Sequence, residues 1–260
     1  MTVTMRKRRT VRKRRPLKRH VQQSLALGDR PKQRKKGAGR PKKGARASER
    51  HKTRPDFKKS EPVHVVIRAA GDIRTLRRRD IYREIRAAVM ITYNRSNFRV
   101  VHLSIQGTHI HFIVEADGKW ALAEGMKALQ TSAARRINRA ITEARGFVRK
   151  GSVFPDRYHP QILSTPRQTR NALAYVLNNW RKHGEDRGYL GRWRYDLYST
   201  GVTFDGWADW DWRINDIPAL FPPLACVLPQ TWLLSEGWKR GGTISTTDVP
   251  SAPRTQALAE

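Results

Sequence analysis

The order of apolar patterns between residues 63 and 183 is the feature that most constrains the fold. Alternating apolar residues predict strands, and apolar residues at helical spacing predict helices. The strands are expected over residues 63–67, 98–106, 109–116 and 157–163, and the helices over 80–92, 120–140 and 166–183. The first six elements have the strand-helix-strand-strand-helix-strand order of a ferredoxin-like domain. We therefore predict an α+β fold, in which a ferredoxin-like βαββαβ sheet carries one added C-terminal helix.

The basic residues are concentrated before this domain begins. The chain has a formal net charge of +31, and its first 60 residues hold 24 Lys and Arg against three acids. This segment has too few apolar residues to offset the entropy lost on folding. We expect residues 1–61 to be a disordered basic tail, 62–184 the folded domain, 185–240 a Trp-rich extension packed on it, and 241–260 a disordered end.

A charge of this size points to nucleic acid as the partner, because phosphate neutralisation supplies affinity without sequence readout. Within the tail, Gly39-Arg40-Pro41-Lys42-Lys43 resembles an AT-hook. Arg40, Lys42 and Lys43 are thus candidate DNA contacts, either in a narrow minor groove or as generic phosphate binders. No apolar run is long enough for a membrane span, and no apolar stretch of a secretory signal follows the basic start. We expect no membrane contact and a cytoplasmic location at the nucleoid.

Two histidines share one face of the third expected strand. In His109-Ile110-His111 the side chains alternate, so both imidazoles point to the same side. Such a pair can converge on a metal ion, although two strand histidines can also simply line a solvated surface. The single cysteine, Cys226, excludes a zinc site built from cysteines.

The last expected helix adds a tyrosine and an amide. Leu173, Val176, Leu177 and Trp180 form its apolar stripe, and Tyr175 lies opposite that stripe. Asn179 is one helical turn after Tyr175, so the two side chains are neighbours. A phenol nucleophile and a carboxamide oxygen for a hard metal therefore come from one turn, with Lys182 on the same face.

These residues resemble a known family. His109-Ile110-His111 is similar to the HUH motif, in which U is a hydrophobic residue. Tyr175-Val176-Leu177-Asn178-Asn179 resembles the tyrosine helix of single-tyrosine HUH transposases. Together with the stretch 153–159, these blocks resemble REP-associated tyrosine transposases over roughly residues 62–183. One departure is Trp180, which stands where many such proteins have proline.

The resemblance implies cleavage and rejoining of single-stranded or hairpin DNA through a 5′-phosphotyrosine. Tyr175 would be the nucleophile, and His109, His111 and Asn179 would hold a divalent metal, Mg or Mn. No nucleotide cofactor is expected, since no P-loop is found. The enzyme would act as a monomer or a homodimer.

Several alternatives remain open at the level of sequence. Arg157 and His159 are candidate phosphate contacts beside the tyrosine helix, but sheet packing would also explain them. The same fold could bind hairpin DNA without cutting it, and a nucleoid-associated basic protein would also explain the tail. A nicking replication initiator or relaxase is the closest enzymatic rival.

Overall fold

The computed structural model describes residues 54–187, 193–209, 218 and 221–248. In this part of the chain, four strands form one antiparallel sheet in the order β2-β3-β1-β4. The strands are β1 (Val63–Arg68), β2 (Phe98–Ile105), β3 (His109–Ala116) and β4 (His159–Ile162). The helices are α1 (Arg79–Met90), α2 (Lys119–Arg145), α3 (Pro166–Lys182) and the short α4 (Trp232–Ser235). Short 3₁₀ turns are η1 (Gly71–Ile73), η3 (Thr200–Thr203) and η5 (Gly237–Gly241). This strand order confirms the ferredoxin-like prediction.

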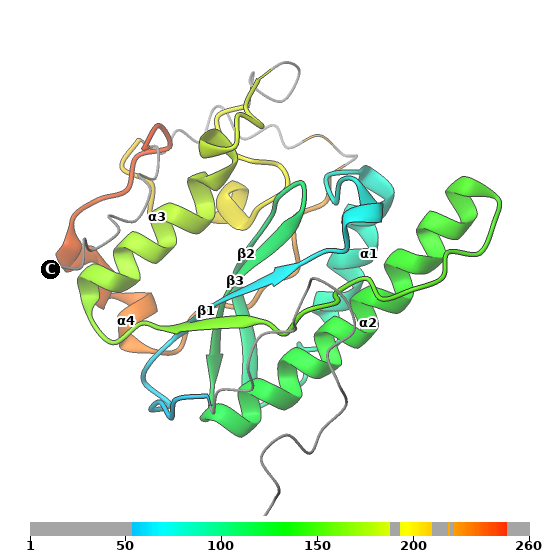
Figure 1. Ribbon diagram of the computed structural model, residues 1–260. Coiled ribbons are helices and arrows are strands. Elements are labelled where there is room, and N and C mark those ends of the chain that lie inside the picture. Colours follow the sequence, from blue (N-terminus) through cyan, green and yellow to red (C-terminus); the bar gives the residue numbers. More distant parts are fainter. Residues whose placement is uncertain (1–53, 188–192, 210–217, 219–220, 249–260) are drawn as a thin grey trace, which may run out of the picture. The chain divides into compact units, whose positions relative to one another are not determined.

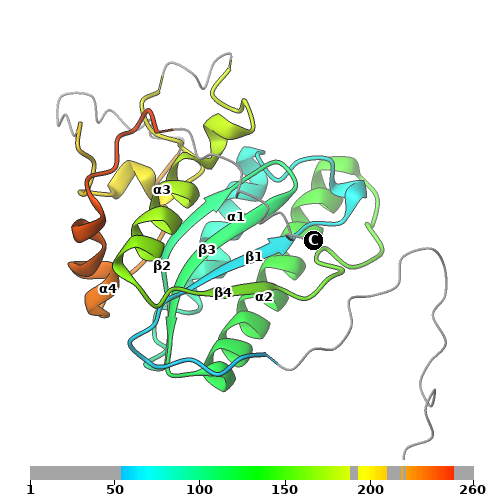
Figure 2. The same cartoon turned by 60° about the vertical axis from the view of Figure 1, so that its left-hand side comes forward.

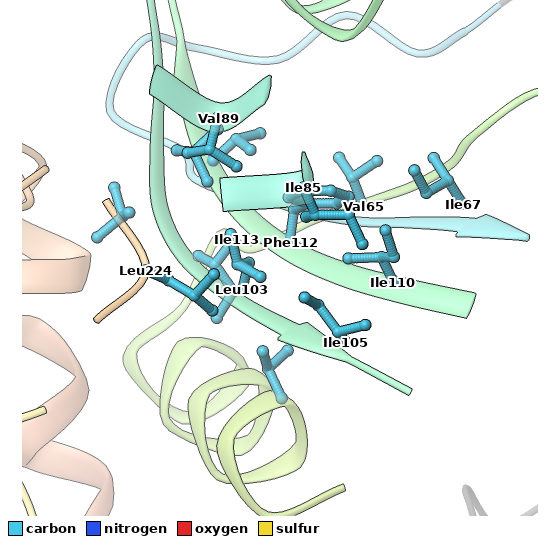
Figure 3. Close-up of a cluster of buried hydrophobic side chains, with 14 of the residues drawn as sticks. Val65, Ile67, Ile85, Val89, Leu103, Ile105, Ile110, Phe112, Ile113 and Leu224 are labelled. Atoms are coloured by element: carbon cyan, nitrogen blue, oxygen red, sulfur yellow. The ribbon is translucent and has the colours of Figure 1, made fainter. Parts of the chain in front are cut away.

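The two faces of the sheet are covered differently. Helices α1 and α2 cover one face, and α3 lies on the other (Figures 1 and 2). The face under α1 and α2 is apolar: alternate residues of β1 and β3 point into it, and Figure 3 shows some of them packed with Ile85 and Val89 of α1. The residues of β1 and β3 buried there are Val63, Val65, Ile67, Ile110, Phe112 and Val114. The other residues of these strands point toward α3.

A β-bulge interrupts the alternation of β2. Strict alternation would put Val101, Leu103 and Ile105 on one face, but the register shifts between Val100 and His102. Val101 is the extra residue of the bulge, and Val100 pairs with Val114 on the α1/α2 face. The bulge keeps both halves of β2 apolar on the core side, which strict alternation could not do.

Several element bounds differ from expectation by one or more residues, and two of them matter here. Helix α2 runs five residues past Ala140, to Arg145, and ends at Gly146, whose φ of 72° is the left-handed conformation that glycine favours. Strand β4 begins only at His159, so Arg157 lies outside it. In both cases the backbone conformation, rather than the apolar pattern, sets the end of the element.

The C-terminal extension packs on the domain over its described residues. Trp207 and Trp238 are buried in the hydrophobic core, whereas Trp232 is about half exposed. The extension also covers the β2 edge, since Ile105 N donates to Tyr198 O and Val227 N donates to Val100 O. The extension is therefore part of the packed domain, not a separate appendage.

The segment after residue 240 corrects another expectation, because it is not disordered throughout. Ile244 and Thr246 are fully buried, and the segment is described as far as Asp248. At the other end, Phe57 packs against the core, so the folded part begins before residue 62. The basic tail with Arg40, Lys42 and Lys43, together with Trp210, Trp212 and residues 249–260, lies outside the described residues. Within the described residues, no helix is both long and apolar enough to span a membrane.

Candidate active site

The histidine face of the sheet is set by the strand register. Antiparallel partners that lie directly opposite point to the same side of a sheet. His111 of β3 is paired with Val66 of β1 and Ser104 of β2, and His109 is paired with Arg68. His109 and His111 therefore share the face under α3, as the sequence predicted.

Helix α3 places Tyr175 and Asn179 over this face. The helix begins at Pro166 and is capped by Thr165, whose hydroxyl oxygen accepts a hydrogen bond from Gln168 N at 3.2 Å. Sequence periodicity placed Tyr175 and Asn179 on a polar side of the helix. In the structure that side faces the histidines instead of open solvent, and Asn179 is fully buried.

The side chains meet at short distances. Asn179 Nδ2 donates to His111 Nε2 at 2.9 Å, and the ring centroids of Tyr175 and His111 are 5.3 Å apart. The rings of His109 and His111 are 4.7 Å apart, and Lys182 Nζ lies 5.3 Å from the centre of the Tyr175 ring. The two sequence blocks, more than 60 residues apart along the chain, therefore form one cluster.

The cluster includes two histidines that the sequence interpretation missed. His64 of β1 stacks on His111 with its Nε2 at 3.1 Å from His111 Nδ1, and His183 packs its ring edge to face with His109 at 5.3 Å. The signal for His64 was present: β1 neighbours β3 in a ferredoxin-like sheet, so a histidine on the polar side of β1 must lie beside the histidine pair. His183 ends α3, and only the packing of that helix shows which strand it meets.

Burial keeps the imidazoles neutral. Desolvation is the main cause that lowers the pKa of His109 to about 4 and that of His111 to about 2. The neighbouring charges act in the same direction, because Arg68 lies near His109, and Lys182 with the other imidazoles lies near His111. Burial also raises the pKa of the Tyr175 phenol. At pH 7 the imidazoles are therefore neutral nitrogen donors, and the positive charges near the cluster come from Arg68 and Lys182.

The donor set fits a divalent metal. With its Nδ1 proton directed to His64, His111 has its lone pair on Nε2, where it accepts the hydrogen bond from Asn179 Nδ2, and His109 lies beside it on the same strand face. A metal that took the place of this hydrogen bond would bind Nε2 and require the carboxamide to turn its oxygen toward the site. Asn179 Oδ1 is buried and has no hydrogen-bond partner among the described residues. In the same part of the chain, no group of three or more His, Cys, Asp or Glu side chains is placed to hold a metal. A metal here would thus need the carboxamide oxygen of Asn179 as the third protein ligand.

The other predicted contacts are divided between the two faces. His159 of β4 is paired with Val66 and is exposed on the histidine face, and Lys182 is exposed beside Tyr175. Arg157 was expected near the tyrosine helix, but it precedes β4 and lines a hollow beside α2. Glu115 also shares the histidine face, where it accepts hydrogen bonds from Arg99 and from the backbone of residues 230 and 231.

The chain is similar to known transposases. Residues 58–179 match the family model described as "Transposase IS200 like". Among solved structures, the chain is similar to a REP-associated tyrosine transposase bound to a REP hairpin. That match has 19% identity and a TM-score of 0.43, and it covers 70% of this chain and 100% of the other.

A second similar structure is a transposase-like protein from Deinococcus radiodurans R1, with 14% identity and a TM-score of 0.32, covering 55% of this chain and 98% of the other. No curated protein matches the chain significantly. The family match contains both the histidine pair and the Tyr175–Asn179 turn, and it confirms the resemblance expected from these motifs. Over residues 58–179, a little under half of its length, the chain is therefore similar to IS200-like transposases.

Proposed function

We propose that this protein is a metal-dependent enzyme that cleaves and rejoins single-stranded DNA at hairpin sites of palindromic repeats. The observation that carries the proposal is the position of one phenol. Tyr175 lies against His111 and one helical turn from Asn179, and Asn179 itself contacts His111. The candidate nucleophile and the three candidate metal ligands are thus close neighbours in one cluster.

His109, His111 and Asn179 would hold the divalent metal, Mg or Mn. When bound there, the metal would supply charge neutralisation at the non-bridging oxygens of the scissile phosphate. The protein contributes the ligand positions: His64 orients His111, and the burial of Asn179 fixes its carboxamide.

Cleavage would begin at the Tyr175 hydroxyl. As its proton leaves, Oη attacks phosphorus, an O–P bond forms, and the bond from phosphorus to the 3′ oxygen breaks. The departing oxygen takes up a proton to become a 3′-OH, and the downstream strand stays attached as a 5′-phosphotyrosine. Because the new ester keeps the energy of the old one, a 3′-OH can attack it and restore both the DNA strand and the phenol. No nucleotide cofactor enters this cycle.

The charge around the phenol supports this role. A neutral phenol is a weak nucleophile, and partial burial raises the pKa of Tyr175 further from neutrality. The Lys182 ammonium, 5.3 Å from the ring, favours the phenolate that must develop during attack. His159, exposed on the same face, and the tail residues Arg40, Lys42 and Lys43 would contact DNA phosphates.

The test is an adduct assay with wild type and Tyr175→Phe. The DNA is a single-stranded hairpin oligonucleotide, taken from inverted repeats near the gene and incubated with Mn²⁺. Wild type should give a covalent adduct on a denaturing gel, with Tyr175 joined to the 5′ end of the downstream fragment. Tyr175→Phe should form no adduct while binding the hairpin within about twofold of wild type, because phosphate contacts dominate affinity.

The matched control is Tyr93→Phe, since Tyr93 is an exposed tyrosine on another part of the surface. It should form the adduct as wild type does. Hairpin binding without an adduct in wild type would instead identify a non-catalytic DNA-binding protein. An adduct that persists in Tyr175→Phe, or a 3′-phosphotyrosine, would assign the chemistry to another residue or another class of enzyme.

A further inference from the structure

A hollow lies beside α2 and the segment that leads into β4, away from the histidine face. We call it the β4 hollow; its walls include Arg54, Lys127, Phe154, Arg157 and Tyr158. Its volume is about 550 Å³, which is within the range of small-molecule sites and large enough for one nucleotide. The proposed cleavage chemistry makes no use of it.

The cations of the β4 hollow are available to a ligand. Arg54, Lys127 and Arg157 have no acidic partner within the described part of the chain, and Asp156 is the one acid on the walls. Elsewhere on α2 the situation is different, because Arg136 and Arg139 both pair with Glu84 of α1. Unpaired cations around a hollow favour an anionic ligand such as a phosphate group.

The walls also offer flat surfaces for a base. The Arg54 guanidinium lies 3.8 Å above the centre of the Tyr158 ring, and Phe154 is only partly buried. Tyr158 itself is 6% exposed, and its hydroxyl has no hydrogen-bond partner in the described structure. Buried hydroxyls normally have such a partner. Aromatic rings combined with cations are the means by which proteins hold single-stranded nucleic acid.

The sheet leaves a path from the β4 hollow to the histidine face. The C-terminal extension covers the β2 edge, whereas β4 forms the opposite edge and pairs with β1 alone among the described strands (Figure 2). Pro160 lies within β4 and has no N–H to donate, so this edge is poorly suited to adding a further strand. Tyr158 lines the hollow, and His159, the next residue, is exposed on the histidine face.

We infer that the β4 hollow binds one unpaired nucleotide of the DNA substrate, with its phosphate on Arg157 and Lys127 and its base against Phe154. The rest of the single strand would pass over the β4 edge to Tyr175. The inference rests on the proposed DNA substrate, but it assigns a separate binding site on the other face of the sheet. Its role is to position the strand, not to react with it.

The experiment compares two DNA probes by fluorescence anisotropy. One is the labelled hairpin with a short unpaired flank, and the other is the same hairpin with a blunt end. Phe154→Leu and Arg157→Gln should each weaken binding of the flanked probe about tenfold and leave the blunt probe within about twofold, because stacking and phosphate contact are lost only for the unpaired part. Phe147→Leu and Arg83→Gln are the controls, since both residues are exposed elsewhere, and they should leave the difference between the probes unchanged.

Crosslinking locates the nucleotide directly. A flank that carries 5-iododeoxyuridine should, on irradiation, attach to a peptide that contains Phe154 or Tyr158. Crosslinks confined to other peptides, or equal affinities of Phe154→Leu and wild type for the flanked probe, would overturn the inference.

The adduct assay separates this failure from failure of the proposed function. At saturating DNA, Phe154→Leu should still form the Tyr175 adduct. If wild type forms the adduct and the hollow variants bind normally, only the hollow is wrongly assigned. If wild type binds neither probe, the proposed function and this inference both fail.

Discussion

The two faces of the sheet serve different purposes, although they are built from the same strands. The face under α1 and α2 is closed and apolar, and Ile110 and Phe112 of β3 are buried in it. The opposite face carries His64, His109 and His111, with Tyr175 packed over them from α3. Alternate residues of one strand therefore contribute to stability and to chemistry, which means that substitutions one residue apart should have separable effects.

The histidine face is itself divided. One part carries the histidine pair and stays partly open beside the exposed Lys182 and His159. The other part, around His102, is covered by the extension, where Thr200 Oγ1 lies 3.2 Å from His102 Nδ1 and the Phe204 ring packs edge to face on the imidazole. The extension thus closes the sheet where it has no proposed catalytic role and leaves it accessible where DNA would bind.

Adjacent substitutions on β3 test the separation of the faces most strongly. His109→Ala should reduce DNA cleavage more than about a hundredfold, because removing a metal ligand costs at least as much as removing the groups that orient one. Hairpin affinity and the free energy of unfolding should change little. Ile110→Ala should instead lower the free energy of unfolding by about 2–5 kcal/mol, since Ile110 is fully buried.

Cleavage rates and urea unfolding of the two variants provide the measurement. Ile110→Ala, assayed where it is still folded, should cleave at close to the wild-type rate. If His109→Ala lost binding and stability together with cleavage, His109 would be a structural residue, and the division between the faces would not hold.

The ferredoxin-like order could be predicted because the core face depends on strand and helix periodicity alone. Val63, Val65 and Ile67 recur at every second position of β1, and that spacing is enough to place them. Tyr175 and Asn179 could be found because their spacing on one helix is local. The bulge at Val101 could not be predicted, since it depends on the pairing of β2 with β3.

The parts that escaped prediction are those created by long-range packing. His64 joins the site through a strand register, and His183 through the seating of α3. Arg157 was misplaced because the apolar pattern overran the true start of β4, and one residue decides which face a side chain meets. The segment around Ile244 was read as disordered because its polar, small residues give no periodic signal, although the segment packs beside Trp207.

A buried ion pair tests whether the extension belongs to the domain. Arg77 precedes α1, and its guanidinium bonds both carboxylate oxygens of Asp196 in the extension, at 2.8 and 3.0 Å. The side chains are 4% and 0% exposed. Asp196→Ala should therefore lower the free energy of unfolding by about 3–5 kcal/mol, because it removes the carboxylate that both guanidinium NH2 groups bond and leaves the buried Arg77 charge with Glu185, at 3.3 Å, as its remaining acidic partner.

Glu236→Gln is the matched control within the extension, since Glu236 forms an exposed pair with Lys239. It should change the free energy of unfolding by less than about 1 kcal/mol. Urea unfolding checks both variants. A small effect of Asp196→Ala, or a separate early transition in wild type, would show that the extension unfolds independently of the sheet.

The smallest expected effect is a pH dependence from the covered part of the histidine face. Burial lowers the pKa of His102 to about 4, from about 6.5 in the unfolded chain. Between these values the unfolded state binds more protons, so the stability from this group is present above pH 6.5 and is lost as the pH falls toward 4. Between pH 7 and pH 5 the loss from His102 should be up to about 2 kcal/mol.

His102→Gln keeps a polar group near Thr200 and removes this titration. Its free energy of unfolding should therefore fall less than that of wild type between pH 7 and pH 5. Urea unfolding without metal or DNA provides the measurement. An equal fall in both proteins would mean that the extension does not desolvate His102.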